Sequence, residues 1–327
     1  MADPSAPAKA PWSVHAGLLG VAVLWGASWP AGRVLALSMP PMTSAAWRFL
    51  LAVVVLALWL SLRGGWPRLS RRQWAGLVLG GAVGVAAWAM LFMLALQRVE
   101  ASRAAIVVTT NPVFTTVLAA WIFKERFNAG VALGLALAVG GAVLVLSKGD
   151  LSGLIAGGFG AGEWLLLGCI ASWTSYTLIG RALTGPPSAL PRYGAGASER
   201  PGTPATGIDS LAATTLSMIV GTVILWAVAL VVDGPASMAH TARTLTPGVW
   251  ALLVLMSLGA TVLSYAWFNR GIAVLGAGTA AGYINLVPVF GVALSALTLG
   301  EKVDAWLAIG GVLTVAGLVV SHRARRG

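Results

Sequence analysis

The chain has few charged residues and especially few acids. Charged residues occupy 9% of its 327 positions, and only ten of them are aspartate or glutamate. A soluble domain of ordinary composition carries about 25% charged residues. This shortage, combined with an apolar fraction of 58%, excludes an ordinary soluble domain and indicates a protein embedded in a lipid bilayer.

Cysteine and histidine are also scarce. The single cysteine, Cys169, excludes a disulfide or a multi-cysteine metal site within the chain. His15, His240 and His322 are scattered near the ends of apolar runs, and no two acids are close enough to form a metal-binding motif. We therefore expect no catalytic residue, no metal and no cofactor, and a membrane-embedded enzyme is a less well supported alternative.

The positive charge of the chain does not form a nucleic-acid-binding surface. The net charge is +11, but Lys and Arg are divided among short segments between apolar runs. In that position they set the orientation of a membrane protein. We therefore expect a lipid bilayer and a small-molecule substrate as partners, no nucleic acid, and a monomer or homodimer. The first residues lack a signal-peptide pattern, so the first apolar run is expected to remain in the mature protein.

Apolar runs bounded by charges or by Gly and Pro clusters predict an all-α integral membrane protein of ten transmembrane helices. The predicted spans are 14–36, 43–62, 73–96, 102–123, 129–147, 161–183, 208–232, 247–269, 274–298 and 303–321. If the N-terminus lies inside, 14 Lys and Arg residues are cytoplasmic and six are external. This excess predicts cytoplasmic tails at 1–13 and 322–327, and both tails on one side require an even number of spans.

The two halves of the chain resemble each other. Identical residues recur at an interval of 148 and, further on, of 176. The matched pairs are Trp25 with Trp173, Gly32 with Gly180, Arg33 with Arg181, Trp74 with Trp250, Pro112 with Pro288, Phe114 with Phe290, Glu125 with Glu301, Gly134 with Gly310, and Gly141 with Gly317. The change of interval requires an insertion, which we place in a Pro- and Gly-rich segment, 184–207, predicted to be a flexible cytoplasmic linker. Five spans are an odd number, so 14–150 and 161–321 are predicted to be inverted five-helix repeats.

Several short motifs occur at matching places in both halves. Asn-Pro-Val-Phe at 111–114 precedes Lys-Glu-Arg at 124–126, and Val-Pro-Val-Phe at 287–290 precedes Gly-Glu-Lys at 300–302. Together with Leu-Trp-Gly-Ala-Ser-Trp at 24–29, this pattern resembles the EamA-like transporters of the drug/metabolite transporter superfamily. The resemblance implies a ten-helix metabolite exporter of the bacterial inner membrane, with a central cavity lined by both halves.

We therefore expect a secondary transporter that exports small metabolites, such as amino acids or related amphipathic compounds, by alternating access. An aromatic-rich, acid-poor interior suits these compounds better than cations, which need a carboxylate partner. Multidrug efflux and passive facilitation are the alternatives. Because all ten acids lie at span ends or in loops, transport is expected to follow the substrate gradient rather than a proton gradient.

Aromatic and polar side chains inside the spans are the candidates for a substrate site. Those of the first and sixth spans recur at helical spacing, so they share one face of each helix. We predict a site drawn from Trp25, Ser28, Trp29, Arg48, Asn111, Trp173, Tyr176, Tyr265, Tyr283 and Asn285. Helix packing is the alternative role for each aromatic residue.

Arg48 is the one charge clearly inside a predicted span, five residues past Thr43 and about 7–8 Å deep. Two interpretations remain open. A snorkelling side chain would place its guanidinium at the membrane interface. An inward-facing side chain could instead bind a substrate carboxylate with two parallel hydrogen bonds.

Pro112 and Pro288 are predicted hinges, because proline inside a span removes a helical hydrogen bond. Glu125 and Glu301 are expected to be solvated helix ends, with gating or packing against the neighbouring helix as the alternatives. Small residues at near-fourfold spacing are expected to let helices approach closely. These are Gly80, Gly81, Gly84, Gly130, Gly134, Gly140, Gly141, Gly310, Gly311 and Gly317.

Overall fold

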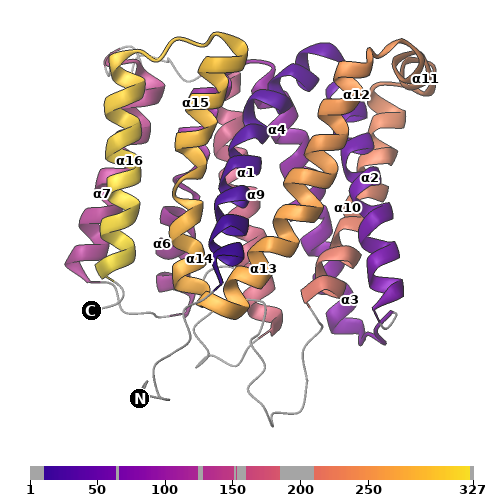
Figure 1. Cartoon of the computed structure of the whole chain (residues 1–327), viewed down its shortest axis with the longest axis horizontal. Helices are drawn as coiled ribbons and strands as arrows, with labels where there is room; N and C mark the ends of the chain where they lie inside the picture. Colours follow the sequence, from indigo (N-terminus) through magenta and orange to yellow (C-terminus); the bar gives the residue numbers. More distant parts are fainter. Residues whose placement is uncertain are drawn as a thin grey trace.

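The computed structural model describes residues 11–63, 66–123, 128–150, 152, 160–184 and 210–324. These residues form a bundle of helices, and none of them is in a strand (Figure 1). The helices are α1 (Trp12–Ser38), α2 (Pro41–Leu62), α3 (Arg71–Gly80), η1 (Gly81–Ala87), α4 (Trp88–Leu96), α5 (Ala101–Val108), α6 (Asn111–Phe123), α7 (Ala129–Ser147), α9 (Ala161–Thr184), α10 (Ser210–Val232), α11 (Pro235–Thr244), α12 (Pro247–Val254), η2 (Leu255–Leu263), α13 (Ser264–Leu275), α14 (Ala277–Ile284), α15 (Val287–Leu299) and α16 (Ala305–Ala324).

Nine helical segments within these ranges are long and apolar enough to cross a membrane. They are Trp12–Ser38, Pro41–Leu62, Arg71–Leu96, Ala101–Ile122, Ala129–Ser147, Leu211–Val232, Pro247–Leu275, Gly282–Leu299 and Ala305–Ala324. The 24-residue α9 is not among them, because Ser, Thr, Trp and Tyr side chains lower the hydropathy of its second half. Large apolar side chains such as Val231 and Leu297 are more than four-fifths exposed, as a surface facing lipid requires.

The bundle has two distinct ends, which Figure 1 shows at its top and bottom. The upper end carries the connections at 39–40, 97–100, 233–246 and 300–304. The lower end carries residues 66–70 and Gly276, and both the start of α1 and the end of α16 lie there. Apart from residue 184, the predicted linker 184–207 lies outside the described residues, as does Glu125.

One predicted boundary is wrong. The apolar runs predict a loop at 270–273, whereas α13 continues to Leu275 and the chain turns at Gly276. Gly276 has a φ of 80°, a conformation that glycine adopts without a steric penalty. Arg270 had been taken as the start of a loop, but it is an exposed residue in the last turns of α13.

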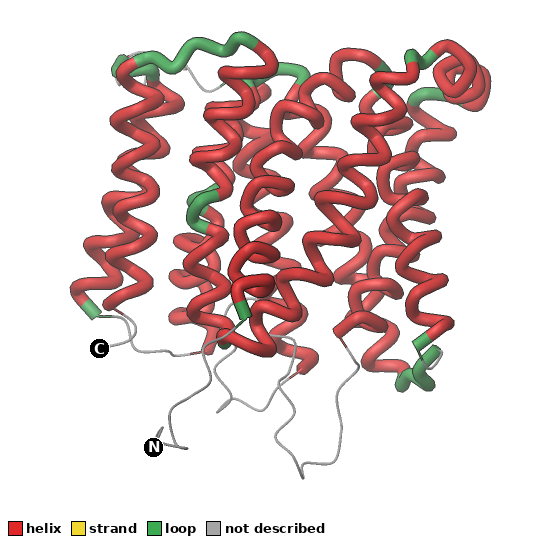
Figure 2. Tube along the Cα trace, viewed as in Figure 1, coloured by secondary structure: helices red, strands yellow, loops and turns green. Residues whose placement is uncertain are grey.

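Two helices are interrupted at equivalent places. The helix formed by α5 and α6 breaks at Thr109 and Thr110, and that formed by α14 and α15 breaks at Asn285 and Leu286, 176 residues later. Figure 2 shows the second break as a loop segment inside the helical column. The hydroxyl groups of Thr109 and Thr110 donate to the carbonyls of Ala105 and Val107, at 2.6 and 2.7 Å.

The two prolines predicted to be hinges lie directly after these breaks. Pro112 and Pro288 each occupy the second position of the helix that follows the break, where the missing N–H group has no helical partner to lose. They therefore lie in the first turn of the second helix of each pair, and their role as hinges stays a prediction. Pro30, inside the first predicted span, lies within an unbroken helix, α1.

Two π-helical segments follow the same interval. η1 lies between α3 and α4, η2 lies between α12 and α13, and their last residues are 176 positions apart. Such insertions are rare and widen a helix locally. They are another feature of the backbone that recurs at the spacing seen in the sequence.

The glycines predicted to pack helices together do so, with one exception. A Cβ atom at Gly134 of α7 would overlap the backbone of Gly317 and Ser321 on α16. The same pair of helices meets again where Thr314 donates to the carbonyl of Ala138 at 3.3 Å. Gly140 has no atom within 4 Å of the position of a Cβ, so its predicted packing role is wrong.

Candidate functional site

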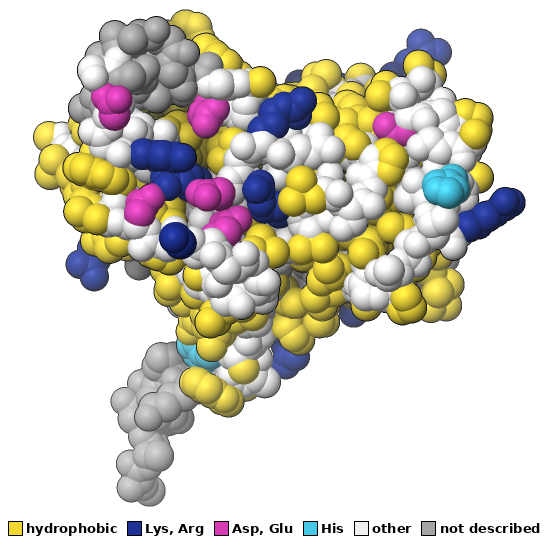
Figure 3. All heavy atoms as spheres, turned by 90° about the horizontal axis from the view of Figure 1, so that it is seen from above, with side chains coloured by type: hydrophobic (Ala, Val, Ile, Leu, Met, Phe, Trp, Pro, Cys, Tyr) yellow, Lys and Arg dark blue, Asp and Glu magenta, His cyan; other side chains and the backbone are white. Residues whose placement is uncertain are grey.

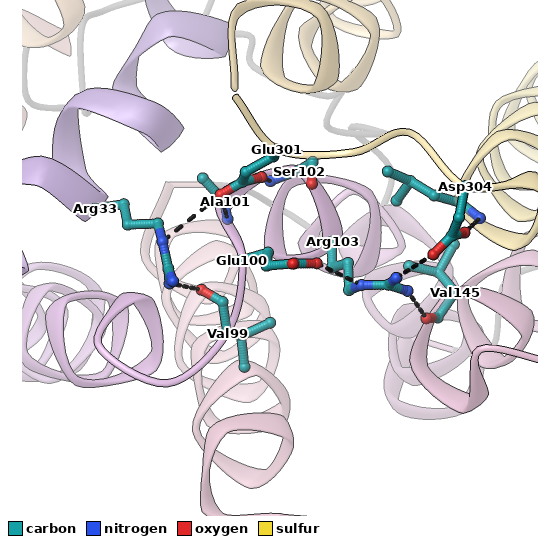
Figure 4. A network of polar contacts seen from close by, with 10 residues as sticks. Arg33, Val99, Glu100, Ala101, Ser102, Arg103, Val145, Glu301 and Asp304 are labelled. Carbon is teal, nitrogen blue, oxygen red and sulfur yellow. Dashed lines mark hydrogen bonds and ion pairs between the residues drawn. The ribbon is translucent and has the colours of Figure 1, made fainter. Parts of the chain in front are cut away.

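A network of charged side chains lies at the upper end of the bundle (Figure 4). Arg33 extends from the last turns of α1, and its Nε lies 3.6 Å from Oε1 of Glu301. Its Nη1 also donates to the carbonyl of Leu96 at 2.9 Å and to that of Val99. Arg33 thus joins α1 to the end of α4 and to the connection between α15 and α16.

Glu301 caps a helix of the other half of the chain. Its two carboxylate oxygens accept hydrogen bonds from the backbone N–H groups of Ala101 and Ser102, each at 2.9 Å. These groups begin α5 and have no partner within the helix, so a carboxylate stabilises them. The Glu301 side chain is only 8% exposed, so the prediction of a solvated helix end is wrong for this residue.

Arg103 forms the second part of the network. Its Nε donates to Oε2 of Glu100 at 2.7 Å, its Nη1 donates to the carbonyl of Val145 at 2.8 Å, and its Nη2 donates to Asp304. The backbone N–H of Leu307 donates to Asp304 and, together with Arg103, lowers the pKa of that carboxyl. Arg103 is therefore a buried cation whose partners come from both halves of the chain.

The two ends of the bundle differ in charge. Figure 3 looks down on the upper end, where acidic and basic side chains lie beside one another. Every acid within the described ranges belongs to this end: Glu100, Asp150, Glu163, Asp233, Glu301 and Asp304. A hollow of about 430 Å³ there is lined by Arg33, Val34, Leu37, Glu100, Leu299, Gly300, Glu301 and Lys302.

Arg48 lies inside the bundle rather than at its surface. Its side chain belongs to α2, and the residue is 6% exposed. The guanidinium carbon lies 5.1 Å from the ring centre of Phe49, 5.9 Å from that of Trp88 and 5.7 Å from that of Phe92. A snorkelling side chain would reach the interface, so that interpretation is wrong.

An aromatic row connects Arg48 with several predicted site residues. The row contains Trp29, Phe92, Trp88, Trp173 and Tyr176, with successive ring centres 5.2, 4.9, 6.1 and 5.6 Å apart. The sequence analysis missed Trp88 and Phe92. Their spacing of four residues, the same as that between Trp25 and Trp29, is the signal that could have revealed them.

Trp25 lies in a different aromatic group. Its Nε1 donates to the carbonyl of Ala260 in η2 at 2.8 Å, and its ring packs on Phe268 at 5.6 Å. The Ser28 hydroxyl donates to the carbonyl of Trp25 at 2.6 Å. Trp25 and Trp173 therefore face separate groups, Trp25 toward η2 and α13 and Trp173 toward α4.

Asn111 contacts the sixth predicted span directly. Its Oδ1 accepts a hydrogen bond from Thr174 Oγ1 of α9 at 2.9 Å and one from Thr115 Oγ1 at 3.4 Å. Asn111 and Thr174 are both buried. Thr115 and Thr174 were not among the predicted residues, because threonine is also a common packing residue in membrane helices.

The remaining predicted residues lie in other contacts. The Tyr265 hydroxyl accepts a hydrogen bond from the hydroxyl of Thr214 on α10, and the Tyr283 hydroxyl lies 2.8 Å from Nδ1 of His15. Asn285 ends α14 and is half-buried. Thus the aromatic row brings together three predicted residues, Trp29, Trp173 and Tyr176, and Arg48 lies against two other rings of that row. The other predicted residues with assigned contacts have separate partners: Trp25, Asn111, Tyr265 and Tyr283.

The apolar helices and the comparisons with known proteins define a multi-pass membrane transporter. The chain belongs to the EamA-like transporter family, whose model matches residues 12–147 and 203–322. This confirms the resemblance seen in the motifs.

Three relatives align with nearly the whole chain. The "Uncharacterized transporter YyaM" of Bacillus subtilis is 27% identical, with 94% of this chain and 93% of the relative covered. The "Probable amino-acid metabolite efflux pump" of Escherichia coli is 27% identical, with 92% of each covered. The "Probable terminal-alkyne amino-acid exporter" of Streptantibioticus cattleyicolor is 25% identical, with 98% of this chain and 95% of the relative covered. One solved crystal structure matches with a TM-score of 0.58 and 18% identity, covering 97% of this chain and 99% of that chain, which supports the fold.

Proposed function

We propose that this chain is a secondary transporter that exports small metabolites, such as amino acids or related amphipathic compounds, by alternating access. We further propose ten spans, with α9 as the sixth, arranged as inverted repeats over 14–150 and 161–321. Two observations support the repeat: the two helix breaks lie 176 residues apart, and the two π-helical segments end 176 residues apart. So do the ring contacts of Trp25 with α13 and of Trp173 with α4, the equivalent helix of the other half.

The lower end is the cytoplasmic one in this proposal, and the membrane is the bacterial inner membrane. The described charges near the lower end are basic: Arg63, Arg68, Arg71, Arg72, Arg270 and Arg323. The described part of the upper end has the acids and an equal number of bases. When the Lys and Arg residues of the other segments predicted to be cytoplasmic are added to the lower end, that end has more bases than the upper end, as the positive-inside rule requires.

The proposal of alternating access rests on the charge network at the upper end. Arg33, Glu100 and Arg103 belong to the first half, and Glu301 and Asp304 belong to the second. Rocking of one half against the other opens a path at this end only if these contacts separate. The carboxylates of Glu100 and Asp304 are partly exposed, so these partners of Arg103 can be hydrated when the contacts separate, which suits a closure that opens repeatedly.

The proposed substrate class, amino acids and related amphipathic compounds, is supported by the aromatic row and by the names of two relatives, which refer to amino-acid efflux and export. Aromatic faces bind the apolar part of an amphipathic solute, and a few polar groups orient it. Carriage of a solute between two compartments needs no catalytic group, so we propose a function without chemistry on the substrate.

Flux in proteoliposomes tests this proposal. Purified protein would be reconstituted and supplied with a panel of amino acids and hydrophobic cations, with and without an imposed pH gradient. We expect saturable flux of amino acids, weakened by Trp173→Ala and unchanged by Trp164→Ala, an exposed tryptophan of the same helix. Selective flux of hydrophobic cations would support multidrug efflux, flux without saturation would support a facilitator, and no flux would contradict transport.

A further inference from the structure

Arg48 is a buried cation for which the described residues supply no counter-charge. Its Nε and Nη1 atoms are inaccessible to water and form no hydrogen bond. Within the described part of the chain, none of the ion pairs includes it. A charge removed from water is costly unless a counter-charge or hydrogen bonds compensate it.

Neighbouring donors on α2 are in the same situation. Ser44 lies one helical turn before Arg48, and its buried hydroxyl has no hydrogen-bond partner. The indole N–H of Trp47 is also buried and unpaired. Guanidinium and indole groups only donate hydrogen bonds, and the Ser44 hydroxyl, which can also accept, bonds to neither of them, so these donors of α2 have no acceptor.

The nearby carboxylate does not supply that acceptor. Asp233 accepts hydrogen bonds from the backbone N–H and the hydroxyl of Thr43, at 2.7 and 2.6 Å. Thr43 lies in the first turn of α2, five residues before Arg48, at a distance of about 7–8 Å along the helix. Asp233 therefore caps the helix and leaves the guanidinium unpaired.

The surroundings of Arg48 indicate what kind of acceptor fits. The ring faces of Phe49, Trp88 and Phe92 lie around the guanidinium. Phe49 and Phe92 belong to the main hydrophobic core, and Trp88 packs against it. Aromatic faces attract the cation without using its N–H groups. An occupant must therefore bring oxygen acceptors for the donors and an apolar part for the rings.

We propose that Arg48 binds the carboxylate of the transported solute, so the substrate class is amphipathic carboxylates. This inference rests on the proposed function and deepens it. A guanidinium presents two parallel N–H groups that match the two oxygens of a carboxylate. The aromatic row from Trp29 to Tyr176 holds the apolar part of the solute. Arg48 then acts as a specificity-determining residue.

Matched pairs of probes test this assignment. Proteoliposomes would receive L-leucine or L-leucinamide, and L-phenylalanine or L-phenylalaninamide, and the flux into protein-free liposomes would be subtracted. We expect wild-type protein to transport each acid with a KM lower than that of its amide by about 10-fold or more. This comparison uses wild-type protein only, so it does not depend on any variant folding.

Variants of Arg48 complete the test. Arg48→Gln should raise the KM for both acids by about 10-fold or more and leave that for the amides unchanged, so the preference disappears. Arg48→Lys keeps the charge but not the paired geometry, and should restore part of the preference. Arg63→Gln is the matched control, since Arg63 also lies over a tryptophan ring of α2 but is exposed.

The outcomes separate this inference from the proposed function. Acids and amides that move equally well, or an unchanged preference in a folded Arg48→Gln protein, would leave a transporter but overturn the carboxylate site. In that case Arg48 has a packing role through its ring contacts. No flux of any amino acid in the broader panel would overturn both the transporter and the site.

Discussion

The two ends of the bundle are held together by different kinds of contact. At the upper end, Arg33 and Arg103 pair with Glu301 and Asp304 across the two halves of the chain. At the lower end, helices meet at backbone distance, as where Gly134 packs on Ser321. Charge pairs can separate and be hydrated, whereas close backbone packing is lost only by forcing the helices apart. We therefore expect the upper end to open during transport while the α7–α16 contact persists.

The sidedness of the two ends is the prediction with the largest effect, because its outcome is all or none. In a Cys169→Ser background, Lys302→Cys at the upper end should react with a membrane-impermeant maleimide added to intact cells. Arg68→Cys at the lower end should react only after the cells are opened. Both positions are exposed, so access to the reagent depends on the membrane alone. Labelling of Arg68→Cys in intact cells would reverse the assignment of the two ends.

Close packing at the lower end predicts a large loss of stability. Gly134→Leu inserts a side chain where the α16 backbone already lies, and should destabilise the protein by about 3 kcal/mol. Gly140→Leu, on the same helix with open space at its Cβ position, should change stability by about 1 kcal/mol or less. Thermal unfolding in detergent would measure both, and the difference should not depend on salt. Equal behaviour of the two variants would show that this contact does not hold the end together.

The charge network predicts a smaller loss that depends on salt. Arg103→Gln removes charged hydrogen bonds to Glu100 and Asp304, and should destabilise the protein by about 2 kcal/mol at low ionic strength. High salt should reduce this difference, because Glu100 and Asp304 are partly exposed. Arg98→Gln is the control, since Arg98 bonds only to a carbonyl of its own helix turn and is exposed. A salt-independent loss would indicate that Arg103 acts by packing.

The smallest expected effect concerns pH. Hydrogen bonds from Leu307 and Arg103 lower the pKa of Asp304 from its ordinary value of 3.8. The stability that Asp304 contributes is therefore fully present above the pKa of the unfolded chain and is lost as pH falls through the lower pKa of the folded chain. Between pH 5 and 8, wild type and Asp304→Asn should differ by a constant amount of stability, which should decrease only in more acidic solution. A difference that changes near pH 6 would point to a histidine instead.

Features that depend on the local sequence were predicted well. The span 129–147 agrees with α7 at both ends, and the helices of the other predicted spans begin within about three residues of their expected positions. The predicted membrane character and the family are confirmed. The loop at 270–273 was misplaced because Arg270 was read as a span boundary, although a helix can extend past the apolar region into water.

Contacts between distant residues were predicted poorly. The sequence placed Glu301 at a helix end, but nothing local indicated that its carboxylate would cap α5, about 200 positions earlier. Trp25 and Trp173 were expected to belong to one site, but nothing local indicated that each ring would pack on the third span of the opposite half. The expectation for Gly140 failed because spacing alone does not tell which side of a helix meets a neighbour.

The sequence by itself determined the membrane class, the helices, the basic character of one end and the repeat interval. These features follow from hydropathy and residue type along the chain, because the free energy of placing a segment in lipid depends on its own side chains and its own backbone hydrogen bonds. Only the tertiary structure decided that Arg48 turns inward onto three aromatic rings and that Arg103 and Glu301 join the two halves. The rotation of each helix about its axis, and the partner it meets, depend on the packing of the whole bundle.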